Sequence, residues 1–480
     1  MKKINLIFTI MLMSTLNLSA QNETDALRYS FLNHGGTARF MAMGGAFGAL
    51  GGDISTLNTN PAGIGIFRGS EFTITPSLNF STVGSNYMNT SYEDIKYSFN
   101  LRNVGFVFTI PLQGGIEEPG MKSVNLGFGI VQHNNFNYRM VAEGYNEHNS
   151  LMTHFLNEAN QHGLKPFTTQ LAYDAWLLGT ENGSYFVDMP DGNVFQRMES
   201  NTSGRIQEFF MTFGGNYNDV AYFGATIGIP SVSYEENFMF QESDINDLNE
   251  EFNSLQYNQN LKTSGRGFNF KLGALFRIAD FVRLGAAIHT PTFYNLDDSY
   301  DNRITSNLNL EEYNSEAKSP KGYFDYELNT PLRALGSLGV VVGNLGVISV
   351  DYEYADYTTM RLRSDTEHFS DANRSIRENF QAQHGVRLGG ELNLAPVVAP
   401  IFLRGGYAMY TSPFNSGNDL ARSSISAGIG LRDKDYFIDF AYVYHMFDDS
   451  FYPYTNVAER PLASLGYTQS SFILTLGLRW

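Results

Sequence analysis

Most of the chain beyond residue 70 alternates between apolar and polar residues with a period of two. The first segment of this kind places Phe72, Ile74, Leu78 and Phe80 on one parity, and thirteen similar segments follow it. Such alternation predicts β-strands with one apolar and one polar face. In most segments one parity holds for about ten residues, which is the length that a tilted strand needs to cross a lipid bilayer. The pattern therefore predicts an all-β protein whose strands cross a membrane.

The predicted strands are distributed along this whole region. In chain order they cover residues 72–80, 104–112, 124–140, 209–213, 221–229, 268–278, 282–288, 332–342, 348–354, 386–394, 401–409, 425–431, 438–444 and 472–480. Their number is even, as in the barrels that single bacterial chains form. We therefore predict a transmembrane antiparallel β-barrel of 14 strands, built by residues 70–480.

The connections between the predicted strands alternate between short turns and long loops. Residues 216–219, 279–281 and 343–344 form short turns, whereas the longest loop covers residues 141–202. Further long loops are predicted at 85–96, 231–263, 293–322, 358–382, 411–418 and 447–464. Short turns at one end and long loops at the other are typical of outer-membrane barrels. The alternative fold is a soluble β-sandwich, which would not be expected to have short turns at one end and long loops at the other.

The longest loop contains residues with helical spacing. Leu151 and Phe155, and later Leu171 and Ala175, are apolar residues four positions apart, as on one face of a helix. Helices are therefore expected within residues 149–180. They form either a small lid that packs on itself or an apolar surface that catches a ligand, and the sequence leaves both interpretations open.

The first twenty residues have the layout of a secretory signal peptide. Lys2 and Lys3 precede an apolar core over residues 4–18, and the small residues at 18–20 form a cleavage site. This core is interrupted by polar residues and is too short for a convincing membrane-spanning helix. We predict that residues 1–20 are removed by cleavage near Ala20, and that the mature chain lies in the outer membrane of a Gram-negative bacterium.

A glycine-rich stretch precedes the first predicted strand. Gly44 and Gly45 begin a region with little side-chain bulk and wide backbone freedom, which suits a segment that folds tightly inside another structure. The region closes with Asn60, Pro61 and Ala62, a turn in which proline fixes φ and moves the preceding residue out of helical space. We predict that this stretch forms a hatch inside the barrel.

Composition narrows the classes of function. The formal net charge of −17 argues against nucleic acid and anionic membrane surfaces as partners. The absence of cysteine excludes disulfides and thiol catalysis. The sequence has no G-x-S-x-G or G-x-G-x-x-G motif, and its histidines are scattered. We therefore expect no enzyme, no cofactor and no metal site.

The chain resembles the FadL family of outer-membrane transporters for long-chain fatty acids and other hydrophobic compounds. The resemblance rests on AMGGA at residues 42–46, NPA at residues 60–62, the fourteen strands and the terminal Trp480. It implies a hatch over residues 21–69, passive uptake without a cofactor, and sideways exit of the ligand through a kink in the third strand. The implied partners are a fatty-acid-like hydrophobic molecule and outer-membrane lipid.

Polar residues interrupt the third predicted strand. Gln132, His133, Asn134 and Asn135 occupy the positions between two apolar runs. Polar groups that face lipid are costly, so these side chains are expected to face protein, water or an opening. One interpretation is a lateral opening in the barrel wall, and the other is a β-bulge that resets the register.

Charged residues occupy many of the positions that face the lumen. Arg277, Arg283, Arg333 and Arg404 are candidates for holding a ligand carboxylate, because a guanidinium matches both carboxylate oxygens. The alternative is that these arginines pair with acidic residues of the lumen or with the hatch, since barrel interiors are normally polar.

Two other functions compete with transport. A FadL-like barrel can serve as a scaffold subunit of an outer-membrane secretion or barrel-assembly complex, as family relatives in the type IX secretion apparatus do, and would then have protein partners. A surface adhesin would depend on the long loops alone. We expect a transporter to retain lipid during purification and a scaffold to retain stoichiometric protein partners.

Overall fold

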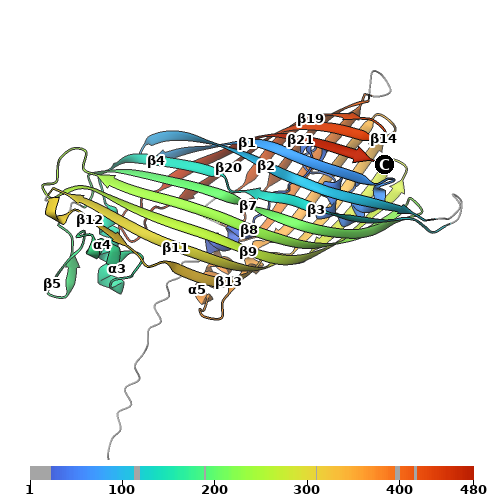
Figure 1. Ribbon diagram of the computed structural model, residues 1–480. Coiled ribbons are helices and arrows are strands. Elements are labelled where there is room, and N and C mark those ends of the chain that lie inside the picture. Colours follow the sequence, from blue (N-terminus) through green and yellow to red (C-terminus); the bar gives the residue numbers. More distant parts are fainter. Residues whose placement is uncertain (1–22, 113–118, 189–190, 310, 395–399, 416–418) are drawn as a thin grey trace, which may run out of the picture.

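The computed structural model describes residues 23–112, 119–188, 191–309, 311–394, 400–415 and 419–480, so the predicted signal peptide lies outside the described residues. Its main feature is a closed antiparallel β-barrel of 14 strands (Figure 1). The barrel closes where β1 pairs with β21 as well as with β2. In order round the wall the strands are β1 (Glu71–Tyr87), β2 (Thr90–Pro111), β3 (Met121–Asn135) with β4 (Tyr138–Asn146), β7 (Val194–Tyr217), β8 (Ala221–Ser243), β9 (Phe252–Ala279), β10 (Val282–His289) with β11 (Phe293–Leu308), β13 (Gly322–Asn329) with β14 (Arg333–Val342), β15 (Gly346–Asp356) with β16 (Arg361–Arg363), β17 (Ala382–Asn393), β18 (Ile401–Tyr410), β19 (Arg422–Arg432), β20 (Tyr436–Phe451) and β21 (Ala463–Arg479).

Each predicted strand overlaps one strand of the wall, so the predicted fold is confirmed. Many strands are longer than predicted. Residues 85–96, predicted as a long loop, instead continue β1 and β2 to a turn in which Met88 and Asn89 have φ of 47° and 62°. The apolar parity ends where strands leave the lipid: in its outer half β8 turns Ser231 and Ser233 outward. The sequence pattern therefore marked only the part of each strand that faces lipid.

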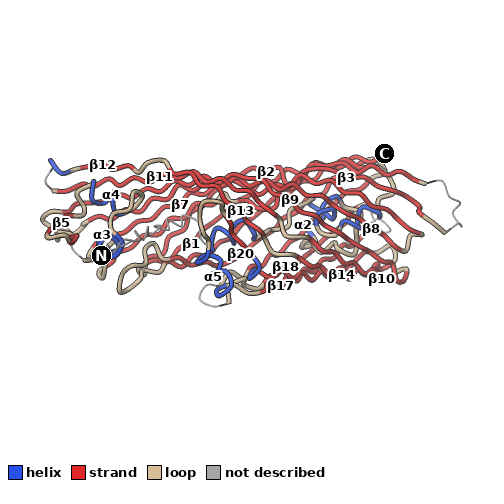
Figure 2. The backbone as a smooth tube through the Cα atoms, turned by 90° about the horizontal axis from the view of Figure 1, so that it is seen from below, coloured by secondary structure: helices blue, strands red, loops and turns tan. Residues whose placement is uncertain are grey.

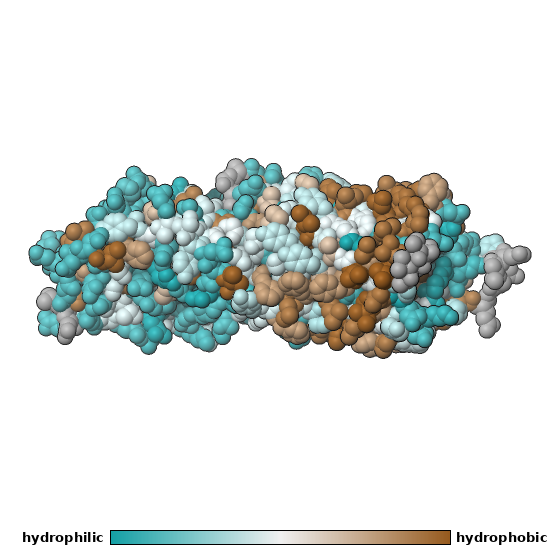
Figure 3. All heavy atoms as spheres, turned by 90° about the horizontal axis from the view of Figure 1, so that it is seen from above, coloured by the Kyte–Doolittle hydropathy of each residue, from teal (hydrophilic) through white to brown (hydrophobic). Residues whose placement is uncertain are grey.

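An apolar belt crosses the face of the barrel seen in Figure 3, over one half of the molecule. It consists of outward side chains such as Phe223, Ile227 and Ile229 of β8, which are 44%, 42% and 44% exposed. The surface towards the long loops is mostly hydrophilic. Side chains of the belt match the hydrocarbon of a bilayer, as in other membrane barrels. Among the described residues, no helix has the length and apolar character needed to cross a membrane.

The barrel wall is taller on one side than on the other. Strands β7, β8 and β9 have 24, 23 and 28 residues, whereas β15, β17, β18 and β19 have between 10 and 12. Helix α5 (Ser370–Asn379) and the 3-10 helix η4 (Tyr357–Thr359) belong to the low side (Figure 1). Their apolar residues pack with helix α1 (Glu23–Ser30) and with inward side chains of the tall wall. This cluster fills the middle of the barrel.

The N-terminal segment continues into the lumen within the belt (Figure 2). It forms helix α2 (Ala38–Ala42) and the 3-10 helices η1 (Ile54–Asn58) and η2 (Pro61–Ile66), all of them almost completely buried. The N-terminal segment therefore lies inside the lumen, where the hatch was predicted, and we call it the hatch from here on.

Wall and hatch meet backbone to backbone. A Cβ built at Gly406 of β18 would lie 2.1 Å from the backbone nitrogen of Gly44, and one at Gly224 of β8 would lie 2.2 Å from the carbonyl oxygen of Pro61. Real Cβ atoms do not approach other atoms this closely, so only glycine fits at these wall positions. At these two points no side chain fits between the hatch and the wall.

Two helices close the end of the barrel that carries the long loops. Helix α3 (Leu151–His162) and helix α4 (Thr169–Asp174) lie there beside the hairpin of β5 (Gly179–Glu181) and β6 (Ser184–Phe186) (Figure 1). Strand β12 (Ser315–Lys318) and the 3-10 helix η3 (Glu311–Tyr313) lie in a neighbouring loop. The helices predicted within residues 149–180 are confirmed. Their apolar faces are buried in a cluster with the tall wall, which fits the packed lid better than an exposed catching surface.

Candidate functional site

The five residues predicted for the hatch lie in two tight turns. Gly44 and Gly45 have φ of 62° and 74°, values that side chains with a Cβ rarely allow. Asn60 begins η2 by accepting a hydrogen bond from the backbone N–H of Ala62 at 3.2 Å, with Pro61 at the first helical position. The Asn60 amide also donates to a backbone carbonyl of β9 at 3.1 Å. The NPA turn therefore both shapes the hatch and ties it to the wall.

Buried polar side chains of two wall strands anchor the hatch. Asp351 of β15 accepts a hydrogen bond from the backbone N–H of Phe47 at 3.1 Å. Three strands along the wall, Lys271 Nζ of β9 donates to Asn58 Oδ1 at 3.1 Å. Both wall residues are buried, and removing one partner of a buried charged contact is strongly destabilising. The core of the hatch is therefore firmly held in this structure.

The wall has an interrupted hydrogen-bond ladder between β2 and its neighbour. Pairing of β2 with β3 runs only as far as Asn103 opposite Val131. Beyond this pair, towards the long loops, β3 has a bulge at His133. The strand continues as β4, which pairs with β7 but not with β2. No ladder pair of the described strands joins residues 94–100 of β2 to residues 132–139 of β3 and β4, and we call this break in the ladder the lateral gap.

The lateral gap is bridged by side chains instead of backbone. Gln132 Nε2 donates to Asn100 Oδ1 at 3.2 Å, and Asn135 Nδ2 donates to Ser98 Oγ at 3.3 Å. Higher up, Lys96 Nζ donates to a backbone carbonyl of β7 at 2.6 Å. A few isolated side-chain contacts, each contributing about 1 kcal/mol, hold two strands together less strongly than a continuous β-ladder with many such bonds. The two strands are therefore held together less strongly here than along the paired part of their ladder.

The N-terminal segment covers the lateral gap from inside. The backbone N–H of Asn33 donates to Asn134 Oδ1 at 2.8 Å. A Cβ at Gly35 would lie 1.8 Å from the carbonyl oxygen of Gln132. His133 turns into the lumen instead, with its Nε2 3.5 Å from Glu208 Oε2. The structure thus places all four residues of the predicted opening at a bulge and a break in β-pairing, and their role as a lateral opening stays a prediction.

A cavity of about 80 Å³ lies between the hatch and the lateral gap. The N-terminal segment contributes its floor, and the strands from β17 to β21 contribute the far wall. Its lining residues are Asn33, His34, Met41, Gly44, Gly45, Arg102, Gln132, His133, Asn135, Tyr138, Arg387, Ala408, Tyr410, Ser424, Val443, His445, Gln469 and Ser471. The cavity therefore connects the upper face of the hatch with the break in the wall.

The four arginines proposed as ligand contacts already have partners among the described residues. Arg277 lies at the turn end of the barrel, and the other three face the hatch or buried acidic residues. The contacts are Arg277 with Asp280, Arg283 with the Leu50 carbonyl (3.0 Å), Arg333 with Glu353 (3.0 Å), and Arg404 with Glu391 and Asp439 (2.6 Å each). This arrangement fits the interpretation of internal pairing, and a ligand role for any of the four stays a prediction.

Sequence reasoning missed Arg102, which lines the cavity. A register shift between β1 and β2 leaves Arg102 without a directly opposite residue, between Asn103 and Leu101. The apolar parity of β2 changes there, from even positions such as Val104 to odd positions such as Phe99. A change of parity within one strand indicates a β-bulge, and that change was the signal that could have identified Arg102.

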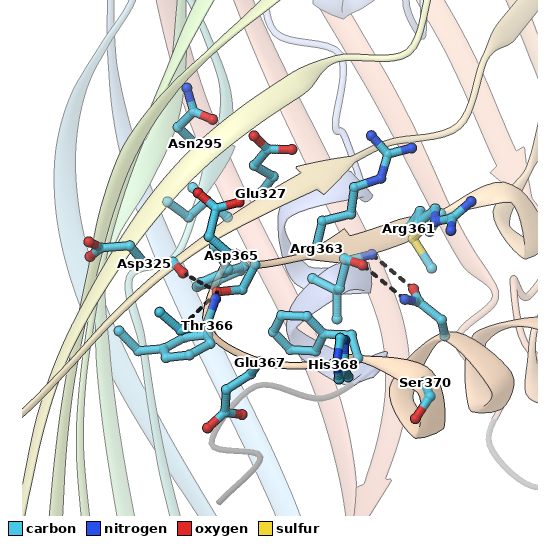
Figure 4. A pocket seen from close by; sticks show the side chains of 18 of the residues that line it. Asn295, Asp325, Glu327, Arg361, Arg363, Asp365, Thr366, Glu367, His368 and Ser370 are labelled. Carbon is cyan, nitrogen blue, oxygen red and sulfur yellow. Dashed lines mark hydrogen bonds between the residues drawn. The ribbon is translucent and has the colours of Figure 1, made fainter. Parts of the chain in front are cut away.

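A groove of about 1210 Å³ opens on the low side of the barrel, between β13, β16 and the segment before α5 (Figure 4). Asp325, Glu327 and Asp365 carry negative charge there, and Arg361 and Arg363 carry positive charge. Part of its lining is apolar and belongs to the cluster that packs on α1. The groove thus reaches from the solvent to the packing layer above the cavity.

A buried carboxylate joins the lid to the tall wall, well beyond the apolar belt. Glu242, near the loop end of β8, is 0% exposed. It accepts hydrogen bonds from Ser150 Oγ at 2.6 Å, from the Leu151 N–H at 2.7 Å, and from Gln196 Nε2 at 2.6 Å. Burial raises the pKa of Glu242 to about 7, although these hydrogen bonds oppose the rise.

Lid stability should therefore depend on pH. The closed lid holds the Glu242 proton with a pKa of about 7, against an ordinary value of 4.5. Stability is then greatest below the ordinary pKa and falls as pH rises towards about 7. Thermal unfolding monitored by Trp176 fluorescence, in a Trp480→Phe background, should show this fall. Glu242→Gln should remove this dependence on pH, and Glu250→Gln, at an exposed position, should keep it. An unchanged fall of the unfolding temperature with pH in Glu242→Gln would show that Glu242 is not its source.

The fold and the filled lumen define the chain as a fourteen-stranded barrel with an internal hatch. The toluene transporter TodX of Pseudomonas putida is similar in structure, with a TM-score of 0.56, 12% identity, and coverage of 93% of this chain and 99% of TodX. A Pseudomonas aeruginosa FadL homologue gives a TM-score of 0.56, 11% identity, and coverage of 94% and 99%. The Ralstonia pickettii toluene transporter TbuX gives a TM-score of 0.53 and 14% identity, with coverage of 93% of this chain and 99% of TbuX.

At these identities the similarity establishes the fold: the chain has the architecture of the FadL homologue and of the toluene transporters over nearly its whole length. No family model matches the sequence, and no curated protein is significantly similar to it.

Proposed function

We propose that this protein is a FadL-like channel for the passive uptake of hydrophobic compounds across the outer membrane of a Gram-negative bacterium. The observation that carries the proposal is the lateral gap, an interrupted β-ladder beside a cavity and above a firmly held hatch. The lid would face the cell exterior and the short turns the periplasm. The structural neighbours include toluene transporters and a FadL homologue, which supports a hydrophobic ligand.

In this proposal the ligand leaves sideways into the membrane. The cavity opens towards the lateral gap, whereas the way down is filled by the hatch, which touches the wall backbone to backbone. Within the N-terminal segment only the residues around Asn33 and Gly35 need to move, since they cover the gap from inside, while the side-chain contacts that bridge the gap separate. The hatch movement that we propose is therefore local, and the core around Asn60 stays in place.

Uptake by whole cells tests the proposed function. Cells that express the protein should take up radiolabelled toluene, a long-chain fatty acid, or both faster than cells that carry an empty vector. Hydrophobic probes also bind to the surface of any barrel. The matched control is therefore a variant of this protein whose lumen is closed by a larger plug, because it keeps the surface and removes the passage. Equal uptake of every hydrophobic probe with and without the protein would contradict the proposal.

One observation favours a second function, that of a scaffold subunit. The groove beside α5 is open, large and rich in charged side chains, as the rim of a protein interface is. Purification in mild detergent separates the two functions. Retained hydrophobic molecules without stoichiometric protein support the channel, whereas stoichiometric protein partners without such molecules support the scaffold.

A further inference from the structure

Two arginines on the outer face of the tall wall have no acidic partner. Arg205 of β7 and Arg266 of β9 are exposed, whereas Ile206, next to Arg205 in the strand, is buried and faces the lumen. Among the described residues, no carboxylate forms a salt bridge with either arginine, unlike Lys262 on the same face, whose Nζ lies 3.1 Å from a glutamate oxygen. The chain has a formal net charge of −17, so this unpaired positive charge is a local exception.

The register of three strands brings the two arginines into one patch. Ser233 of β8 lies opposite Arg205, and Ser231 of β8 lies opposite Arg266. Ser264 of β9 lies opposite Ser233, and all three serines are exposed. With strands about 4.8 Å apart and a rise of about 3.4 Å per residue, the Cα atoms of the two arginines are about 12 Å apart. Their long side chains can therefore reach one headgroup between them, and we call these five residues the outer arginine patch.

The outer arginine patch borders the apolar belt. The nearest outward apolar residues of the three strands are Phe209, Ile229 and Phe268, which are 41%, 44% and 51% exposed. Arg266 is two residues beyond Phe268, a step of about 7 Å along the strand. The headgroup layer on each side of the hydrocarbon core is roughly 5–8 Å thick. The patch therefore lies at the height of lipid headgroups, directly beyond the residues that contact acyl chains.

We propose that the outer arginine patch binds the phosphate headgroup of an outer-leaflet lipid, whose acyl chains lie along Phe209, Ile229 and Phe268. This proposal rests on the proposed function, because that function places the long loops outside the cell and hence the patch in the outer leaflet. A guanidinium donates two parallel, charge-assisted hydrogen bonds to phosphate oxygens. The serine hydroxyls between the arginines add neutral donors to the same headgroup.

A lipid at this position lies beside the lateral gap. Arg205 is opposite Asn135 of β3, whose Nδ2 donates to Ser98 Oγ of β2 across the gap at 3.3 Å. On the β2 side of the gap, Tyr97 and Phe99 are 67% and 70% exposed on the outer face. The gap is thus bordered by aromatic side chains on one side and by the bound lipid on the other. A hydrophobic ligand that leaves through the gap then meets acyl chains instead of water.

Two variants test the patch by different routes. Arg205→Gln combined with Arg266→Gln removes both positive charges. Ser233→Asp combined with Asn295→Asp keeps both arginines and neutralises them, because Ser233 lies opposite Arg205 and Asn295 lies opposite Arg266. Opposite charges on directly opposite residues of two strands attract each other. All four positions are exposed, so both variants are expected to fold.

Native mass spectrometry of the purified protein should compare the affinity for lipid A with that for lipid A whose phosphates have been removed. We expect the natural protein to bind the phosphorylated lipid about tenfold more tightly or better, since charge-assisted hydrogen bonds are among the stronger ones. Both patch variants should lose this preference. Arg303→Gln combined with Lys318→Gln is the matched control, because it removes two exposed positive charges nearer the long loops. It should keep the preference.

The outcomes separate this inference from the proposed function. A preference for phosphorylated lipid that survives in both patch variants would overturn the site, as would its absence from the natural protein. Binding of inorganic phosphate as tightly as lipid A would overturn the assignment to a lipid. Uptake of hydrophobic probes at the level of an empty vector, by cells whose protein keeps the preference, would overturn the channel and leave the lipid site intact.

Discussion

A disulfide across the lateral gap should reduce uptake of a hydrophobic ligand to the level of cells that lack the protein. The variant combines Asn100→Cys with Gln132→Cys, whose native side chains are in hydrogen-bond contact at 3.2 Å. The natural chain has no cysteine, so these are its only thiols. A covalent bond replaces a contact that can separate, and the wall then stays closed at the point where we place the exit. Reduction of the disulfide should restore uptake in the same cells.

The matched control joins the same two strands where they are already paired. Val104 of β2 lies opposite Ile130 of β3 in the intact ladder. Val104→Cys with Ile130→Cys adds a disulfide below the gap, where the wall does not need to open, and uptake should continue. Uptake that persists with the gap disulfide fully formed would rule out this exit.

A side chain at position 406 should prevent the hatch from seating. At Gly406 a Cβ would lie 2.1 Å from the backbone nitrogen of Gly44 and 2.3 Å from the backbone carbon of Met43. Backbone atoms on both sides cannot rotate away as a flexible side chain can. We expect Gly406→Val to destabilise the hatch by about 3 kcal/mol, the upper part of the range for overpacked cores. The lumen should then conduct ions in planar bilayers.

Gly405 provides the control for this substitution, since it is the next residue in β18 and exposed on the outer face. A Cβ there would have only one neighbour, at 4.0 Å. Gly405→Val should leave conductance and the unfolding temperature close to those of the natural protein. A Gly406→Val barrel that conducts no ions and is as stable as the natural protein would show that the hatch does not contact the wall at this position.

The fold was predictable because a membrane imposes a simple rule on each strand. Only alternation keeps an apolar face in lipid, so Phe223, Ile227 and Ile229 mark β8 without knowledge of any partner strand. The rule stops where the strands enter water, and the hairpin turn at Met88 was therefore misplaced within a loop. The unequal height of the wall results from the parts of β7, β8 and β9 that extend beyond the lipid, so the sequence pattern did not predict it either.

The site was predictable only in part. Gln132 and Asn135 stood out because polar side chains in a lipid-facing run need a reason. The pairing of Arg333 with Glu353 depends on the register between neighbouring strands and on the position of the N-terminal segment, and neither is written in a local pattern. Arg102 required a further step, the recognition that a change of parity marks a bulge that points a charge inward.

The most direct test of the central claim is to map the ligand's route through the natural protein. A fatty acid with a photoreactive group near its carboxylate should label residues around Arg102 and Tyr138, and one with the group at its tail should label Phe99 on the outer face. Labelling would be read by mass spectrometry of peptides from protein in outer-membrane vesicles. If the ligand instead labels the cavity below the hatch, around Arg39 and Phe67, it passes through the hatch and not through the wall.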